Sequence, residues 1–188
     1  MRRTVVVALG HRARHGKDTL AGMIHALFPT TSKLYSLADD LKAHCRVNLG
    51  MTKKDSPLLQ REGSRIRDEK GLDFWIRLVQ LKIEEHEDNL AGKPHIAIVP
   101  DMRYLNEKEW VEASGGLTVK VTRLNADGTL FIDPSRPANH PSEIELEGAT
   151  FNKHIVAKHG DFGALERASY EIAEILKERV GRLSKETA

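Results

Sequence analysis

The chain has 188 residues, of which 40% are hydrophobic, 30% charged and 5% aromatic, and its formal net charge is +2. These values are ordinary for one soluble domain that buries a core of its own. No apolar run approaches the roughly 20 residues of a membrane span, and the single cysteine, Cys45, excludes an intramolecular disulfide. We therefore expect a soluble cytoplasmic protein without membrane contacts.

Charge is distributed unevenly along the chain. Residues 1–67 contain 13 Lys and Arg against 5 Asp and Glu, whereas residues 68–188 contain 16 against 22. Clustered positive charge concentrates anionic ligands, so the N-terminal part is a candidate phosphate-binding region. Solvated helix faces produce the same pattern, and charge alone does not separate nucleotides from nucleic acid.

Strands and helices alternate along the first half of the chain. A continuous run of β-branched residues predicts a buried strand over about Thr4–Leu9. A helix over about Lys17–Leu27, a short strand over Lys33–Leu37 and a helix over Ala38–Asn48 follow. Two more helical stretches come next, and the second places four apolar residues on one face. These are Trp75, Leu78, Val79 and Ile83.

The same alternation continues in the second half. We expect strands over His95–Val99, Leu117–Thr122 and Lys153–Ala157, and helices over about Asn106–Ala113 and Gly163–Val180. The segment from Asn125 to about Pro141 carries Asp-Gly, three prolines and few apolar residues, which indicates a surface excursion.

This order of elements predicts an α/β fold with a largely parallel sheet. Fully apolar strands support the prediction, because crossover helices cover both faces of a parallel sheet. The segments at about 50–70 and 124–141 are too long for simple connectors, and long loops of compact domains are often lids.

The strongest motif lies between the first strand and the first helix, and reads Gly10-His11-Arg12-Ala13-Arg14-His15-Gly16-Lys17-Asp18-Thr19. A phosphate-binding loop points main-chain N–H groups inward, which requires glycine where φ is positive or space is tight. The following helix N-terminus adds N–H groups and a partial positive charge. Lys17 would contact the β- and γ-phosphates, and Asp18 or Thr19 would organise Mg²⁺. Arg14 and His15 complete the candidate nucleotide-binding residues.

This motif departs from the P-loop pattern in two ways. Five residues separate its glycines instead of four, and Asp18 stands where the pattern has Ser or Thr. The alternative interpretation is a turn that ends in glycine and carries basic side chains.

Asp101 and Arg103 form a second candidate group. Asp101 ends a predicted buried strand, at the sheet edge where ligands bind in open α/β folds. A carboxylate there can ligate Mg²⁺ directly or through water, and Arg103 can bind phosphate with its planar guanidinium. Alternatively, Asp101 caps the next helix.

Together these motifs resemble phage and bacterial deoxynucleoside monophosphate kinases, a family of P-loop kinases. The matching blocks occur in the family's order and span about residues 4–160. They are Gly16–Thr19, Ser36–Lys42, Leu59–Ser64 with Arg67, Asp73–Trp75, Asp101–Glu107 and His140–Glu143.

The resemblance implies one P-loop kinase domain over residues 1–188, with a five-stranded parallel sheet flanked by helices. It also implies ATP and Mg²⁺ as cofactors, a helical acceptor-binding region at about 38–90 and a lid at about 124–141. Four residues match acceptor-site positions: Asp39, Lys42, Arg67 and Trp75.

Physical roles follow for these four residues. Asp39 can bond a hydroxyl or act as a general base, Lys42 and Arg67 can hold an acceptor phosphate, and Trp75 can stack on a base. The alternatives are core packing for Trp75, which lies on an apolar helical face, and simple solvation for Lys42 and Arg67.

Two arginines, Arg123 and Arg136, flank the expected lid. An arginine folded over the transferring phosphoryl group would neutralise charge there, and we name Arg136 as the catalytic candidate. His140 and Glu143 match a family block without a derivable role. The nine histidines show no metal-binding spacing, so Mg²⁺ is the one metal expected.

Three functions stay open from the sequence. The first is transfer of phosphate from ATP to a deoxynucleoside monophosphate. The second has the same chemistry on the hydroxyl of a hydroxymethylated pyrimidine, of the 5-hydroxymethyluracil type, within DNA. The third is a non-catalytic nucleotide-binding module. The preferred acceptor and homodimerisation are also left open.

Overall fold

A computed structural model describes residues 3–90 and 93–185. Its strands are β1 (Thr4–Gly10), β2 (Ser32–Leu34), β3 (His95–Met102), β4 (Leu117–Leu124) and β5 (Lys153–Lys158). Its helices are α1 (Lys17–Leu27), α2 (Asp39–Leu49), α3 (Ser56–Lys70), α4 (Phe74–Asn89), α5 (Leu105–Ala113), α6 (Pro141–Ile144) and α7 (Phe162–Lys185).

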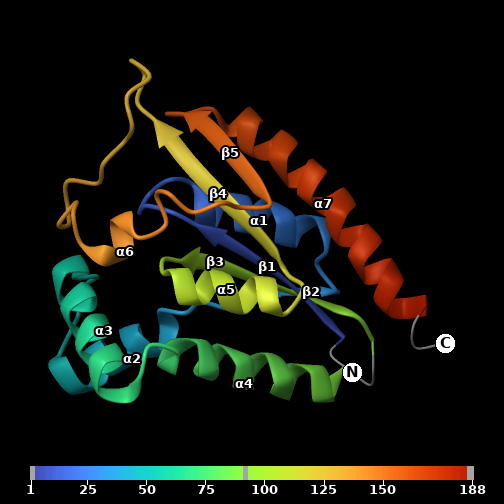
Figure 1. The fold of residues 1–188 in the computed structure, drawn as a ribbon, viewed down its shortest axis with the longest axis horizontal. Helices are drawn as coiled ribbons and strands as arrows, with labels where there is room; N and C mark the ends of the chain where they lie inside the picture. Colours follow the sequence, from blue (N-terminus) through green and yellow to red (C-terminus); the bar gives the residue numbers. More distant parts are fainter. Residues whose placement is uncertain (1–2, 91–92, 186–188) are drawn as a thin grey trace.

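The five strands form one parallel sheet in the order β2-β3-β1-β4-β5. This confirms the predicted α/β fold with a five-stranded parallel sheet flanked by helices (Figure 1). β1 is the central strand and is buried on both faces, which explains its unbroken apolar sequence.

Helices cover the sheet on both sides (Figure 1). Val5, Val7 and Leu9 of β1 face one core cluster, which they share with α1 and α7. The alternate residues Val6 and Ala8 face a second cluster, which includes side chains of α2 to α5. Two separate cores therefore hold β1 in place, and the loop after β1 starts from a rigid strand.

The sheet differs from the sequence prediction at its β2 edge. β2 ends at Leu34 rather than Leu37, although the amide of Tyr35 still donates to the carbonyl of Ile98 at 2.8 Å. From Ser36 onward the chain bends around the carboxylate of Asp101. This tertiary contact ends the strand and begins α2.

Helix α7 is longer than predicted and reaches Lys185 instead of ending near Val180. The added turn is stabilised because Val180 and Leu183 pack against the first core cluster.

The two long segments have different structures. Most of 50–70 is the regular helix α3, which begins after Asp55, whose side chain accepts a hydrogen bond from the amide of Leu58 at 2.9 Å. This helix confirms the first of the two helical stretches predicted after Asn48, whereas the expectation of a lid-like loop over 50–70 is wrong. Residues 125–140 are irregular, as expected, and start with a turn at Gly128 in which Asn125 donates to Thr129 at 2.8 Å.

Candidate functional site

The loop of residues 10–17 connects β1 to α1, and we call it the phosphate loop after the ligand that its sequence predicts. Gly16 has φ 91°, in the left-handed region that glycine adopts without strain, and its carbonyl accepts from the amide of Leu20 at 2.9 Å. His11 and Arg14 also have positive φ values, 99° and 57°. Two non-glycine residues in that region accompany the five-residue spacing of the glycines, at a cost of about 1–3 kcal/mol each.

Gly10 is needed for a different reason. A Cβ atom at this position would lie 2.7 Å from Cε of Met102 and 3.1 Å from Cδ1 of Leu146. Any larger residue would require the side chains of Met102 and Leu146 to shift. The two glycines thus serve the two purposes predicted from the sequence, close approach at Gly10 and a positive φ at Gly16.

The histidines of the loop are buried against β4. Nδ1 of His11 and of His15 lie 3.3 and 3.2 Å from the carbonyl oxygen of Val121, and Nε2 of His15 lies 2.9 Å from that of Phe131. Burial lowers the pKa of His11 to about 3, and burial also lowers the pKa of His15. Both rings are neutral near pH 7, and the contact predicted between His15 and phosphate would come from its main-chain amide.

Lys17 lies across the inside of the loop. Its side chain is buried, and Nζ donates to the carbonyl of Arg12 at 2.5 Å. Burial lowers the pKa of the ammonium well below its ordinary value, and the nearby charge of Arg103 adds to this effect. A buried cation with a single carbonyl partner is suited to bind an anion that replaces this partner.

Asp18 and Thr19, the metal-organising candidates, are exposed at the start of α1. Within the described residues, no group of three or more His, Cys, Asp and Glu side chains is arranged to hold a metal ion. Mg²⁺ coordination would therefore need phosphate oxygens in addition to protein groups.

The carboxylate of Asp101 is bound to the N-terminal end of α2. It accepts from Oγ of Ser36 at 2.6 Å and from the amides of Leu37 and Ala38 at 2.9 and 3.1 Å. Asp101 thus fastens the connection between β2 and α2, rather than capping the following helix α5. Its predicted contact with Mg²⁺ is compatible with a water-mediated link.

Arg103, two residues later, reaches back to the phosphate loop. Its Nη1 donates to the carbonyl of His11 at 3.0 Å and to Oε1 of Glu143 at 3.2 Å. Burial lowers the pKa of this guanidinium. The side chain is therefore held at the junction of β1, β3 and α6, and its contact with phosphate stays a prediction.

A cavity of about 250 Å³ opens beside the phosphate loop. We call it the central cavity. Its polar lining includes Asp18, Ser36, Lys42, Lys54, Gln60, Arg67, Asp101, Arg103, Tyr104, Glu107 and Arg136, and its apolar lining includes Leu41, Leu59 and Trp75. The predicted acceptor residues Lys42, Arg67 and Trp75 therefore meet in one cavity with Arg103.

Asp39 lies outside this lining, although it was predicted to face the acceptor. Its carboxylate accepts from Nζ of Lys42 at 2.9 Å, and the side chain is mostly exposed. Burial raises the pKa of Asp39, but the hydrogen bond and charge of Lys42 outweigh burial, so the net pKa lies below its ordinary value. A carboxylate with a lowered pKa is a weaker general base.

Arg67 projects from α3 into the central cavity. Its guanidinium carbon lies 3.7 Å from the ring centre of Tyr104, and its Nη1 lies 3.8 Å from Oε1 of Glu107. Nη2 donates to Oδ1 of Asn106 at 3.3 Å, whereas Nη1 is buried and has no hydrogen-bond partner. Burial raises the pKa of Glu107 to about 7, so part of its population is neutral near this pH.

Trp75 packs in the second core cluster, as one of the two interpretations from the sequence expects, and also lines the central cavity. Its Nε1 lies 3.5 Å from the carbonyl oxygen of Gly63 on α3. Stacking on a ligand stays a prediction.

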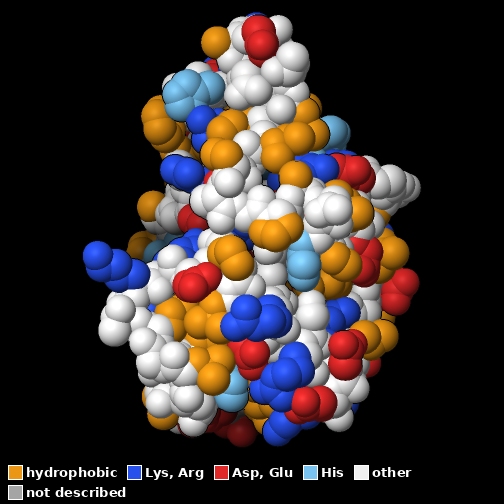
Figure 2. All heavy atoms as spheres, turned by 90° about the vertical axis from the view of Figure 1, so that its left-hand side faces the viewer, with side chains coloured by type: hydrophobic (Ala, Val, Ile, Leu, Met, Phe, Trp, Pro, Cys, Tyr) orange, Lys and Arg blue, Asp and Glu red, His pale blue; other side chains and the backbone are white. Residues whose placement is uncertain are grey.

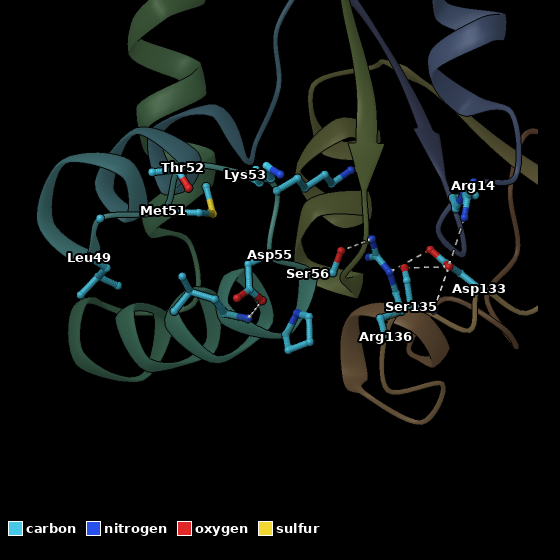
Figure 3. Close-up of a pocket in the computed structure, with 14 residues that line it drawn as sticks. Arg14, Leu49, Met51, Thr52, Lys53, Asp55, Ser56, Asp133, Ser135 and Arg136 are labelled. Atoms are coloured by element: carbon cyan, nitrogen blue, oxygen red, sulfur yellow. Dashed lines mark hydrogen bonds and ion pairs between the residues drawn. The ribbon is translucent and has the colours of Figure 1, made fainter.

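A larger and more open groove of about 770 Å³ adjoins the central cavity (Figure 3). We call it the outer groove; residues 49–58 line one side, and Arg14 with Asp133, Ser135 and Arg136 line the other. The two sides meet where Nη2 of Arg136 donates to Oγ of Ser56 at 3.0 Å. Lys54, Ser56 and Arg136 line both spaces, so the groove and the cavity adjoin at these residues.

Several known proteins share this architecture. A protein from Chloroflexus aurantiacus described as a candidate kinase aligns with a TM-score of 0.50 at 10% identity, over 95% of this chain and 98% of that one. The tunicamycin resistance protein of Deinococcus radiodurans aligns with a TM-score of 0.49 at 12% identity, over 92% and 95%. Shikimate kinase from Aquifex aeolicus aligns with a TM-score of 0.39 at 14% identity, over 93% of this chain and 98% of that one. The chain matches no protein-family model and no curated protein sequence.

The alignment at a TM-score of 0.50, the strand order and the glycine-lysine loop after the central strand agree with one another. The chain has the P-loop kinase fold. At these identities the likeness concerns the fold, and the P-loop kinase fold places the phosphate loop and the central cavity at the carboxyl ends of β1 and β3. Within the part of the chain that the structure describes, no helix combines the length and apolarity that crossing a membrane requires.

The sequence reasoning assigned no role to three residues of this candidate site. Tyr104 and Glu107 line the central cavity, and Glu143 contacts the phosphate loop. All three stand inside blocks that carried the family resemblance. Their contacts join residues far apart in the chain, and no local pattern predicts such contacts.

Proposed function

We propose that this protein is an ATP-dependent kinase that phosphorylates a deoxynucleoside monophosphate. The observation that carries the proposal is Nη1 of Arg67, which is buried at the central cavity and lacks a hydrogen-bond partner. Leaving such a group unpaired costs about 1–3 kcal/mol or more. An anionic acceptor that enters the cavity would supply the missing oxygen.

On the donor side, the phosphate loop would hold the triphosphate of ATP. Main-chain amides of the loop and the N-terminus of α1 would donate to phosphate oxygens, and Lys17 would exchange the carbonyl of Arg12 for a phosphate. Asp18 and Thr19, with Asp101 through water, would hold Mg²⁺, which supplies charge neutralisation between the phosphates.

On the acceptor side, Arg67 and Lys42 would bind the acceptor phosphate, and Trp75 and Tyr104 would lie against the base. Arg103 and Arg136 line the same cavity and would neutralise the transferring phosphoryl group. Residues 124–141 would act as the lid that carries Arg136.

This arrangement favours a phosphate over a hydroxyl as the attacking group. An ionised phosphate needs no strong general base, so positioning and charge neutralisation supply most of the catalysis. Asp39, the base candidate predicted from the sequence, has a lowered pKa and lies outside the lining of the central cavity.

The test is an acceptor panel with γ-labelled ATP. The purified protein is incubated with the deoxynucleoside monophosphates, the matching ribonucleotides, plain DNA and hydroxymethylated DNA. We expect label in a deoxynucleoside diphosphate, and none with the Lys17→Ala variant. Label in DNA alone, or in no product, would contradict the proposal.

The hydroxymethylated base in DNA stays the second candidate, because the outer groove adjoins the central cavity and carries Lys53 and Lys54. Such a groove could hold a DNA strand while one base enters the cavity. On the face of the molecule shown in Figure 2, however, Lys and Arg side chains are interspersed with Asp and Glu. Binding of modified duplex DNA that weakens steeply with salt would favour this candidate.

A further inference from the structure

The carboxylate of Glu143 is buried between three segments of the chain, with 4% of the residue exposed. Oε2 accepts from the main-chain amide of Ala13 in the phosphate loop at 2.9 Å. Oε1 accepts from Nη1 of Arg103 at 3.2 Å and from Nη1 of Arg136 at 3.0 Å. A buried carboxylate is costly unless such donors pair with it.

Each of these three partners belongs to a different part of the proposed phosphoryl-transfer machinery. Ala13 is in the phosphate loop, Arg103 follows the metal-linked Asp101, and Arg136 lies in the expected lid segment. Both arginines line the central cavity, whereas Glu143 does not. The carboxylate therefore contacts the guanidiniums without reaching the space where the acceptor would lie.

The remaining contacts of the two arginines agree with such an anchoring role. In the described part of the chain, Arg103 makes its side-chain hydrogen bonds through Nη1. Arg136 is held on its other sides by Oγ of Ser56 at 3.0 Å and by Oδ2 of Asp133 at 3.3 Å. Glu143 contacts both arginines and the phosphate loop at once, and Arg103 also donates directly to the carbonyl of His11 in that loop.

We propose that Glu143 is a positioning residue for phosphoryl transfer, which fixes Arg103 and Arg136 against the phosphate loop. This inference rests on the proposed function, because it assigns both arginines to the transferring phosphoryl group. Glu143 itself exchanges no proton and contacts no substrate. Its carboxylate sets the orientation in which both guanidiniums meet the phosphoryl oxygens.

The substitution Glu143→Gln separates positioning from simple folding support. Gln keeps the size of the side chain and one acceptor oxygen but removes the negative charge that holds two guanidiniums. Misplacing catalytic groups by about 1 Å can cost about 100-fold in rate. Removing a buried negative charge beside the triphosphate leaves the affinity for ATP unchanged or raises it. A merely structural defect would weaken ATP binding together with turnover.

Glu147→Gln is the matched control. Glu147 lies four residues after Glu143 and pairs with Arg12 of the same loop, but it does not line the central cavity. Glu147→Gln removes an ion pair with the phosphate loop, whereas Glu143→Gln removes the ion pairs with Arg103 and Arg136. Glu143→Asp is the second variant. It keeps the negative charge on a side chain that is shorter by one methylene group, and it replaces Glu143→Gln if that variant fails to fold.

The experiment measures two quantities on the full-length protein: the dissociation constant for ATP with Mg²⁺ by calorimetry, and single-turnover cleavage of γ-labelled ATP with and without a deoxynucleoside monophosphate. We expect Glu143→Gln to cleave ATP about 10- to 100-fold more slowly with unchanged or tighter ATP binding. We expect the cleavage rate of Glu143→Asp to fall less than that of Glu143→Gln. The cleavage rate of Glu147→Gln should stay within about threefold of the wild-type rate.

Equal rate losses in Glu143→Gln and Glu147→Gln, with ATP binding weakened in both, would overturn the proposal. So would a wild-type rate in Glu143→Gln. Cleavage of ATP by water needs no acceptor, so the effect of the Glu143 variants can be measured even when no monophosphate is phosphorylated. A protein that cleaves ATP but phosphorylates no monophosphate would contradict only the proposed acceptor.

Discussion

The guanidinium of Arg67 lies over the ring of Tyr104, with its carbon 3.7 Å from the ring centre. Because the two residues belong to α3 and to the turn before α5, this contact joins the helical region to the end of β3. It also orients Nη1 of Arg67, which lacks a hydrogen-bond partner and lies 3.8 Å from Oε1 of Glu107. The proposed acceptor site is thus preorganised on one side by a cation–π pair.

The first prediction concerns Arg67. Arg67→Met should raise KM for the acceptor about 10- to 100-fold, since a hydrogen bond to a charged group is worth about 1.5–3 kcal/mol. KM for ATP should change little, because Arg67 lies on the acceptor side. The control is Arg65→Gln on the same helix, whose guanidinium pairs with Glu62 and Glu69. An unchanged acceptor KM in steady-state assays would show that Arg67 does not bind it.

The second prediction separates the two kinase candidates at Asp39. With a phosphate acceptor, Asp39→Asn should lower kcat by less than about threefold, because no proton has to be removed. With a hydroxyl acceptor, loss of the base should lower kcat by about 100- to 10,000-fold at unchanged acceptor binding. The measurement is kcat and KM of the variant with the acceptor found in the panel.

The third prediction concerns Lys17. Lys17→Ala should lower kcat at least about 100-fold, because the cation that neutralises phosphate charge is lost. The fold should persist, since burial of this ammonium is itself unfavourable. Circular dichroism and the melting temperature check the fold, and Lys177→Ala on the exposed side of α7 is the control. Turnover at the wild-type rate would refute the role of the loop lysine.

The fourth prediction concerns pH and His95, a buried residue of β3 whose pKa burial lowers to about 4. At pH values between about 6.5 and about 4, the unfolded chain binds a proton at His95 that the folded chain does not bind. The stability that neutral His95 provides is therefore complete above about pH 6.5 and is lost as the pH falls.

Urea unfolding at about pH 7.5 and about pH 5 measures this effect. His95→Gln should reduce the pH slope of the unfolding free energy by up to about 1.4 kcal/mol per pH unit. The exposed His159→Gln is the control. An equal slope in wild type and His95→Gln would show that His95 is not neutral in the folded protein.

The sequence predicts those parts of the protein whose cause is local. The unbroken apolar runs of β1 and β3 identify a sheet covered on both faces, and glycine, lysine and the helix start identify the phosphate loop. The end of β2 is not predictable in this way. It depends on the carboxylate of Asp101, which binds the amide of Leu37 across 64 positions of the chain.

The same distinction applies to the candidate site. Lys42, Arg67, Trp75 and Arg103 are recognisable because they stand in motif blocks, and the structure brings them into one cavity. The anchoring contacts of Glu143 are not recognisable, because three segments from distant parts of the chain must meet before the carboxylate has partners. Asp39 stands in a motif block as well, yet packing leaves it outside the cavity lining.

The central claim is that the phosphate loop binds the triphosphate of ATP. It is tested most directly by a crystal structure of the protein with Mg²⁺ and a non-hydrolysable ATP analogue. We predict a triphosphate surrounded by the amides of the loop, with Nζ of Lys17 moved from the carbonyl of Arg12 onto phosphate oxygens. An analogue bound elsewhere, with Nζ of Lys17 still hydrogen-bonded to the carbonyl of Arg12, would contradict the claim.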